Sequence, residues 1–324
     1  MSLVLTASEV MQVLDMDLAL VAARDAFQAY GEARVNMPPK AYLILAQGDF
    51  RAMYGEIHLP QDHICGLKWV NVHPANSAKG LVTVMAKILL NDPETGLEFA
   101  DLDGTHITDY RTGAAGGVAV QYLAKADATR LGLVGAGAQA RTQAAAILKV
   151  RSIRDIVVFD RHREHSQILA NVLAKAFGIK ARAAADAAEA VRDRDIVVTT
   201  TPSRTPVVKR EWVAAGTHIN AIGADAAGKQ ELDPAILTEA KVVVDDWAQA
   251  SHSGEINVPL AQGELSPERI CGCLGDIVAG KKAGRTAPEE ITVFDSTGLI
   301  IQDLTLALAV YKRARQEGLG EEKN

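Results

Sequence analysis

The chain contains few cysteines and few aromatic residues, and it has neither a long hydrophobic run nor a strong charge of one sign. Its three cysteines form no pair with a histidine at zinc spacing, so we expect a reducing compartment and no metal site. No stretch of about 18 apolar residues predicts a membrane span, and the first residues lack the basic segment of a signal peptide. We therefore expect a cytoplasmic protein. The net charge of −6, with dispersed basic residues, indicates neither a nucleic-acid partner nor an anionic membrane surface.

The first third of the chain predicts helices followed by antiparallel strands. The 324 residues, 48% of them hydrophobic and 23% charged, suit a soluble globular protein of about two domains. Residues 7–33 predict an amphipathic helix pair, with Thr6 and Glu9 spaced as a capping box. Residues 38–90 are short apolar or alternating runs separated by glycine, proline and asparagine, which predict antiparallel strands. The turn NDPETG predicts that its flanking runs pair as a hairpin.

The sequence changes again from Thr112, where the small residues of TGAAGGVAVQYLA predict a helix. After it, apolar β-branched runs of four to six residues alternate with helical segments as far as ITVFDS. This alternation predicts an α/β domain with a parallel sheet and right-handed crossovers. We expect the last helix, at about Asp303–Glu317, to return to the first domain.

A dinucleotide-binding motif lies between a predicted strand and a predicted helix, in LGLVGAGAQARTQ. Gly135 would make the tight turn, Gly137 would let the backbone approach the pyrophosphate, and Ala140 takes the third small position. The N-terminus of the following helix favours an anion. Asp160 ends the next strand, 23 residues after Gly137, where an acid binds the adenosine ribose. The alternative is a glycine turn in an unrelated α/β fold.

The residues around Asp160 bear on the choice of cofactor. A carboxylate repels the 2′-phosphate of NADP, so Asp160 favours NAD. Arg161 and Arg163 follow within three residues, and an arginine there can bind that phosphate, so NADP remains an alternative cofactor. The hydroxyls of TTTPS, at residues 199–203, are expected to line the cofactor cleft, with strand-end capping as the alternative.

Several cations stand in apolar settings outside this domain: Lys40, Arg51, Lys68 and Arg111. Together they describe a pocket for a carboxylate, although each alone is more often an exposed or snorkelling side chain. A desolvated lysine also acquires a lowered pKa suited to proton transfer. Asp225 follows the fifth strand of the α/β domain, where nicotinamide and substrate should meet, and its alternative role is a helix N-cap. His73 and His218 are more consistent with structural histidines than with acids.

These motifs, taken together, resemble the ornithine cyclodeaminase/mu-crystallin family. The resemblance is carried, in order and over nearly the whole chain, by GLKWVNVHP, TVMAKILLNDPETG, RTGAAGG, GAGAQ, THINAIGAD with GKQELD, and EITVFDSTGL. Within the family, MPPK, FRAM, TTTPSRTPVVK and GEIN look most similar to the archaeal-type alanine dehydrogenase branch.

The resemblance implies a fold and an assembly. It implies a Rossmann NAD(P)-binding domain at 113–302, inserted in an α+β substrate-binding and dimerisation domain formed by 1–112 and the returning helix at 303–324. It also implies a homodimer whose N-terminal strands join across the two-fold axis. NAD is the expected cofactor, and a small amino or 2-oxo acid the expected substrate.

The resemblance also implies roles for individual residues. Lys68 would be the proton donor and acceptor, and Asp225 would stand near the reacting carbon. The substrate carboxylate would face Lys40, Arg51 and Arg111. The cofactor would be contacted by Arg111, Ala138, Gln139, Asp160, Asn220, Ala221, Ile222, Lys229 and Ser296.

The expected activity is NAD-dependent oxidative deamination of L-alanine to pyruvate and ammonium, and the reverse amination. Ornithine cyclodeaminases carry an acid where this chain has Arg51, and a cation there would repel the second ammonium of ornithine. The alternatives are a cyclic ketimine (1-pyrroline-2-carboxylate) reductase, an ornithine cyclodeaminase, and a mu-crystallin-like NAD(P)H-dependent binding protein without turnover.

Overall fold

The computed structural model describes residues 2–323, which divide into two compact units. The strand-rich unit comprises the chain up to Arg111 and the chain from Leu299 onward, and the parallel-sheet unit comprises Thr112–Gly298. The boundaries expected from the sequence, at 112/113 and 302/303, differ from these by one and four residues. Among the described residues, no helix is both long and apolar enough to cross a membrane.

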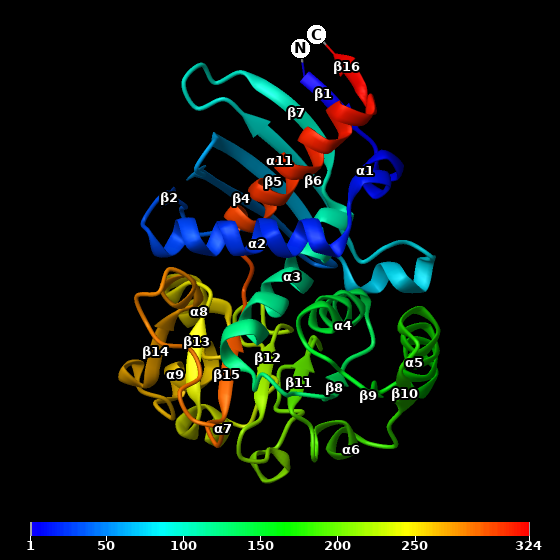
Figure 1. Cartoon of the computed structure of the whole chain (residues 1–324), viewed down its shortest axis with the longest axis vertical. Coiled ribbons are helices and arrows are strands. Elements are labelled where there is room, and N and C mark those ends of the chain that lie inside the picture. Colours follow the sequence, from blue (N-terminus) through cyan, green and yellow to red (C-terminus); the bar gives the residue numbers. More distant parts are fainter. Residues whose placement is uncertain (1, 324) are drawn as a thin grey trace. The chain divides into compact units, whose positions relative to one another are not determined.

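The strand-rich unit is built on an eight-stranded sheet ordered β16-β1-β7-β6-β5-β4-β2, with β3 also paired to β4 (Figure 1). The predicted antiparallel strands are confirmed, and the chain around NDPETG closes the β6–β7 hairpin. The sequence did not predict β1 and β16, which are short and lie beyond this run. The strands are β1 (Ser2–Leu5), β2 (Val35–Asn36), β3 (Ala41–Leu45), β4 (Gly48–His58), β5 (His63–Val72), β6 (Val84–Asn91), β7 (Glu98–Asp103) and β16 (Glu321–Lys323).

Helices cover one face of this sheet. The predicted helix pair is α1 (Ala7–Val13) and α2 (Met16–Gly31), and the predicted capping box joins Thr6 to Glu9. The last helix, α11 (Ile300–Glu317), packs against α2 and against β4, β5 and β6 (Figure 1). Strand alternation then sends Met53, Lys68 and Ile88 towards the buried face and leaves Tyr54 and Trp69 exposed.

The helix predicted from Thr112 begins seven residues earlier, as α3 (Thr105–Leu123). Its start follows β7 directly, and the Asp103 carboxylate accepts a hydrogen bond from the Thr105 backbone N–H at 3.0 Å. The early start therefore places Arg111 on a helix rather than in a junction loop.

The parallel-sheet unit contains the predicted α/β alternation. Its eight strands run in the order β10-β9-β8-β11-β12-β15-β13-β14, and every pairing is parallel. The chain winds outward in opposite directions from β8 and β11, which creates a switch point at their carboxyl ends. The strands are β8 (Arg130–Val134), β9 (Asp155–Phe159), β10 (Lys180–Ala183), β11 (Ile196–Thr199), β12 (His218–Ala221), β13 (Lys241–Val244), β14 (Ile270–Cys273) and β15 (Thr292–Asp295).

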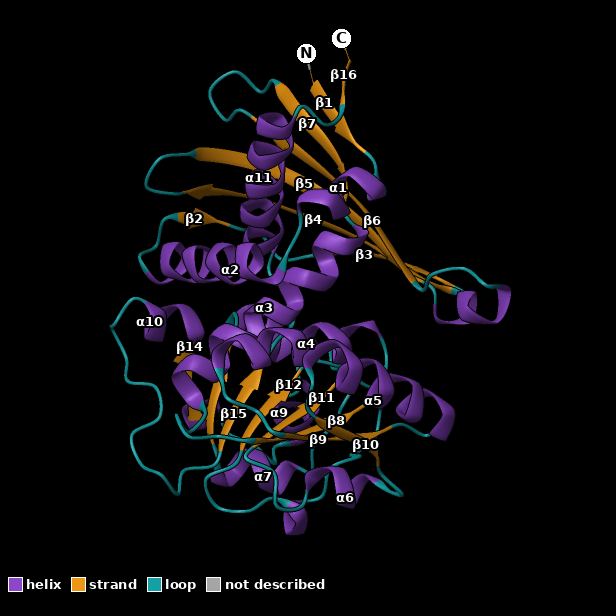
Figure 2. Cartoon of the chain, turned by 45° about the vertical axis from the view of Figure 1, so that its right-hand side comes forward, coloured by secondary structure: helices purple, strands orange, loops and turns teal. Residues whose placement is uncertain are grey.

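Helices lie on both faces of this sheet, with α4 and α5 on one side and α6 and α7 on the other (Figure 2). Ile156 and Val158 of β9 pack into the core beneath α4 and α5, whereas Val157 packs into the opposite core. The helices are α4 (Ala138–Val150), α5 (Arg163–Phe177), α6 (Ala187–Val191), α7 (Pro234–Glu239), α8 (Trp247–Ser253), α9 (Asn257–Gln262) and α10 (Leu274–Val278).

Candidate active site

Lys68 is fully buried on the helix-covered face of the strand-rich unit. It pairs across the sheet with Met53 on β4 and Ile88 on β6, so its neighbours along the sheet are apolar. Its Nζ lies 2.8 Å from Oδ2 of Asp303, in the first turn of α11. A buried ammonium is tolerated when an opposite charge compensates it, and Asp303 supplies that charge.

Arg111 shares the same carboxylate. Its Nε donates to Oδ1 of Asp303 at 3.0 Å and its Nη1 donates to Oε1 of Gln302 at 3.1 Å. Asp303 therefore holds Lys68 on one oxygen and Arg111 on the other. The sequence predicted Asp303 only as the start of a helix, although an acid within the apolar segment IIQDLTLALAV was a signal of a buried charge.

The surroundings of Lys68 lower its pKa to about 7. Burial is the largest cause, the positive charges of Arg111 and Lys40 act in the same direction, and the bond to Asp303 opposes them. The structure thus brings together three of the four predicted cations. A pKa of about 7 means that both protonation states of the Lys68 amine are populated near neutral pH, as a general acid or base requires.

Asp109 is a second acid that the sequence analysis missed. Burial raises its pKa to about 6, although the charges of His106, Arg111 and Lys68 act to lower it. It lies two residues before Arg111 on α3, so its electrostatic contact with the cations follows from the early start of that helix.

Arg51, the fourth predicted cation, has an acid of its own. Its Nε donates to Oδ1 of Asp49 at 2.7 Å, and its guanidinium lies over the ring of Tyr42, 5.5 Å from the centroid. Only 6% of Arg51 is exposed. Its positive charge is therefore partly compensated, which the sequence analysis did not anticipate.

The glycine-rich loop of the parallel-sheet unit has the geometry that the motif predicts. Gly135 has a φ of 108°, and a Cβ there would lie 2.5 Å from Oγ1 of Thr200, so only glycine fits. Gly137 is the N-cap residue of α4 and offers no side-chain cap, and a Cβ on it would meet nothing within 4 Å. The open backbone at this helix start can accept a phosphate group.

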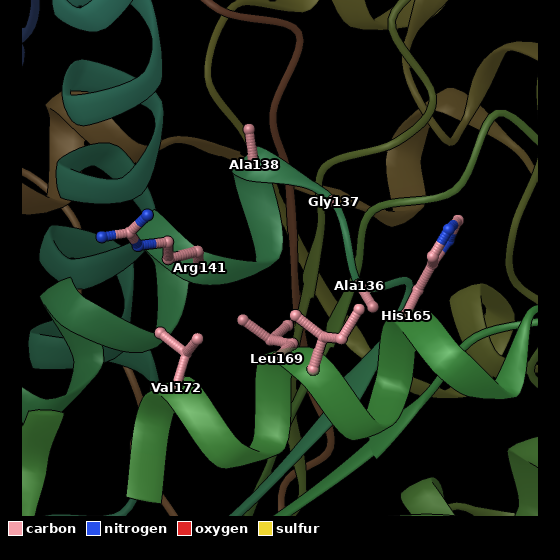
Figure 3. A pocket seen from close by; sticks show the side chains of 8 residues that line it. Ala136, Gly137, Ala138, Arg141, His165, Leu169 and Val172 are labelled. Atoms are coloured by element: carbon pink, nitrogen blue, oxygen red, sulfur yellow. The ribbon is translucent and has the colours of Figure 1, made fainter. Parts of the chain in front are cut away.

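Asp160 ties this loop to the end of β9. Its Oδ2 accepts a hydrogen bond from the Ala136 N–H at 3.0 Å, and its Oδ1 accepts one from the His162 N–H at 2.9 Å. Beside the loop lies a cavity of about 300 Å³. The loop, α4 and α5 line it, and Figure 3 labels Ala136, Gly137, Ala138, Arg141, His165, Leu169 and Val172. Ile168 completes the lining. Arg161 is exposed next to Asp160.

Asp225 lies in the loop after β12, where it forms an ion pair with Lys229. The alternative role as a helix cap is wrong, because the next helix, α7, is capped by Asp233. The structure thus joins two of the predicted site residues of this unit in one ion pair.

Several other predicted cofactor residues are buried in the parallel-sheet unit. The Asn220 amide donates to Gly116 O and Gln143 Oε1, and its oxygen bonds His218. Burial lowers the pKa of His218 to about 3, so this histidine is neutral and structural. The remaining buried members of the predicted set are Ala221, Ile222 and Ser296.

The hydroxyls of the TTTPS segment are partly committed to an internal network. Thr199 and Thr201 both donate to the buried carboxylate of Glu231 at 2.7 Å, so these two hydroxyls join strand end to loop rather than line a cleft. Two further buried acids that the sequence analysis missed lie close by. Burial raises the pKa of Asp295 to about 8, and burial with the charge of Glu231 raises the pKa of Glu255.

The family model described as Ornithine cyclodeaminase/mu-crystallin family matches residues 1–318. The chain is 46% identical to the alanine dehydrogenase of Archaeoglobus fulgidus over 320 residues, which cover 98% of this chain and 97% of that protein.

Two solved structures are similar over their whole length. An archaeal alanine dehydrogenase dimer with bound NAD has a TM-score of 0.95 and 47% identity, covering 100% of this chain and 99% of that one. The Δ1-pyrroline-2-carboxylate reductase of Thermococcus litoralis, in complex with NADH and L-proline, has a TM-score of 0.95 and 35% identity, covering 99% and 100%. The fold of this chain is thus shared with both proteins.

Proposed function

Because the chain belongs to the ornithine cyclodeaminase/mu-crystallin family, we propose that it catalyses the NAD-dependent oxidative deamination of L-alanine and its reverse. The family predicted from the motifs is confirmed. The chain is an NAD-dependent oxidoreductase of that family, and the proposal concerns its substrate and the roles of its residues. The balanced reaction converts L-alanine, NAD⁺ and water into pyruvate, ammonium, NADH and a proton.

The parallel-sheet unit fits the cofactor. Gly135 makes the turn, the open backbone of Gly137 suits the pyrophosphate, and the carboxylate of Asp160 at the end of β9 suits the ribose hydroxyls. Held by these residues, NAD would supply the acceptor for the hydride of the substrate α-carbon. Asp225, which pairs with Lys229, is proposed to orient the ammonium group or the attacking water.

The observation that carries the proposal is the desolvated Lys68 held by Asp303 beside Arg111. Arg111 and Lys40 supply positive charge for a substrate carboxylate, which an arginine binds with a bidentate fork. With its pKa lowered to about 7, Lys68 accepts a proton from the substrate nitrogen or from water during oxidation and returns it during amination. The positive charges of Lys40, Arg111 and Arg51 oppose a substrate with a second ammonium group, although Asp303 and Asp49 compensate part of that charge.

A reductase of cyclic imino acids is the second candidate. It is supported by the similarity to the Thermococcus litoralis enzyme that was solved with NADH and L-proline. The same lysine would protonate the ring nitrogen of 1-pyrroline-2-carboxylate. This reaction shares the substrate carboxylate and the hydride transfer at the α-carbon with the first. It differs in that the C=N bond lies in a ring and is not hydrolysed, so no ammonium is released.

Product analysis with single amino acids tests the proposal. L-Alanine with NAD⁺ is expected to give pyruvate, ammonium and stoichiometric NADH. Proline and ammonium from L-ornithine without net NADH would overturn it in favour of a cyclodeaminase. Tight NADH binding without turnover of either amino acid would overturn it in favour of a binding protein.

A further inference from the structure

Three potential metal ligands converge at the end of the β4–β5 hairpin, away from the residues discussed above. The ligand atoms of Glu56, His58 and His63 all lie within 4.8 Å of one another. Nε2 of His63 is 2.6 Å and Nε2 of His58 is 3.2 Å from Oε1 of Glu56. The two imidazole rings are stacked, with centroids 3.7 Å apart.

Strand register explains why these three side chains meet. Glu56 and His58 are two residues apart on β4 and therefore share a face of the sheet. His63 is the direct antiparallel partner of His58, and Glu56 pairs with Cys65, so Glu56 and His63 are diagonal neighbours. The three ligands thus stand on paired strands, which hold side chains more firmly than a loop does.

We propose that Glu56, His58 and His63 bind one divalent transition-metal ion, with Zn²⁺ as the preferred ion. Two imidazole nitrogens and a carboxylate oxygen are a ligand set that Zn²⁺ accepts, at about 2.0–2.2 Å from each atom. Tetrahedral ligands at that distance lie about 3.3 Å from one another, so the observed N–O separations need to widen by less than about 1 Å. The two stacked imidazole rings also have to turn so that both Nε2 lone pairs point at the ion. Water completes the fourth position.

The charges around the hairpin suit a cation. Besides Glu56, the carboxylate of Asp92 acts electrostatically on His63. Arg34 opposes an incoming cation, but its guanidinium donates to the backbone carbonyl of His58 rather than to the ligand atoms. The thiol of Cys65 donates to the carbonyl of Asn91 and stays outside the ligand set. In the single chain both histidines are exposed, on the sheet face that also carries Tyr54 and Trp69.

Calorimetric titration of tag-free, EDTA-treated and desalted full-length protein with ZnCl₂ tests this site. We expect saturable binding of one ion per chain, and at least about tenfold weaker binding in His58→Gln and in His63→Gln. His252→Gln, at an exposed histidine of α8, is the matched control and should bind as the wild type does. Unchanged melting temperatures in EDTA would show that the variants are folded.

A visible spectrum with Co²⁺ gives a second readout, because a four-coordinate ion with two histidine ligands absorbs more strongly than hydrated Co²⁺. Loss of that spectrum in both hairpin variants supports the site. The proposal is overturned if the wild type shows no saturable binding, or if His58→Gln and His63→Gln bind Zn²⁺ as tightly as the control. Neither outcome depends on the substrate of the enzyme.

Discussion

Lys68 on β5 and Asp303 on α11 are far apart in the sequence, yet Nζ of Lys68 lies 2.8 Å from Oδ2 of Asp303 and both side chains are buried. The same carboxylate binds Arg111 through its other oxygen. Asp303 therefore fixes the position of two cations at once. It also limits how far burial depresses the pKa of Lys68, because an adjacent negative charge favours the protonated amine.

The pH dependence of alanine oxidation should reflect the pKa of Lys68 and its dependence on the charge of Asp303. Oxidation requires Lys68 as a base, so kcat/KM should rise with pH through about 7, the lowered pKa of this lysine. In Asp303→Asn the charge that raises this pKa is gone, so the inflection should move to lower pH and kcat should fall. Steady-state rates over the neutral range test both statements. An inflection that stays in place in Asp303→Asn would contradict the link between the two residues.

Lys68→Ala should lose activity without losing the cofactor. We expect kcat to fall by about 10²–10⁴-fold, the range of a general acid or base. NADH affinity should stay nearly constant, since most residues assigned to the cofactor belong to the parallel-sheet unit. Lys175→Ala is the control, because Lys175 is an exposed lysine in the last turn of α5. Equal kcat values of the two variants would show that Lys68 is not the general acid or base.

Cofactor preference should depend on the charge of Asp160. NADH should bind the wild type at least several-fold more tightly than NADPH, because a carboxylate repels the 2′-phosphate. Asp160→Asn keeps an acceptor for the Ala136 N–H but removes the charge, so the preference should move towards NADPH, helped by Arg161. Titration by protein-fluorescence quenching measures both affinities. Glu164→Gln, an exposed acid on α5, should leave the preference as it is, and an equal shift in both variants would defeat the argument.

The protein is expected to form a homodimer. The sheet face opposite α2 and α11 exposes large apolar side chains, among them Tyr54, Trp69 and Met85, and a second copy of the chain is expected to cover them. Light scattering should give twice the chain mass of 34.5 kDa. Trp69→Glu should weaken the dimer, whereas Val21→Glu, at an exposed apolar residue of α2, should not. A stable, active monomer of the wild type would contradict this.

Local patterns explain what the sequence could predict. Gly135, Gly137 and Asp160 act through their own backbone and a strand end, so a short motif contains the information. Lys68 was recognisable as a cation in an apolar strand. Its partner Asp303 was not, because their contact depends on how α11 packs on β5, which no local pattern encodes. Asp49 was within reach of inference, since it shares a strand face with Arg51 two residues later.

The central claim is that the substrate is the open-chain alanine or pyruvate rather than a cyclic imino acid. Its most direct test compares kcat/KM for NADH oxidation with pyruvate plus saturating ammonium against kcat/KM with 1-pyrroline-2-carboxylate, on the same wild-type preparation. We expect the higher kcat/KM with pyruvate plus ammonium. A higher value for the cyclic ketimine, with little action on pyruvate, would contradict it and identify a reductase.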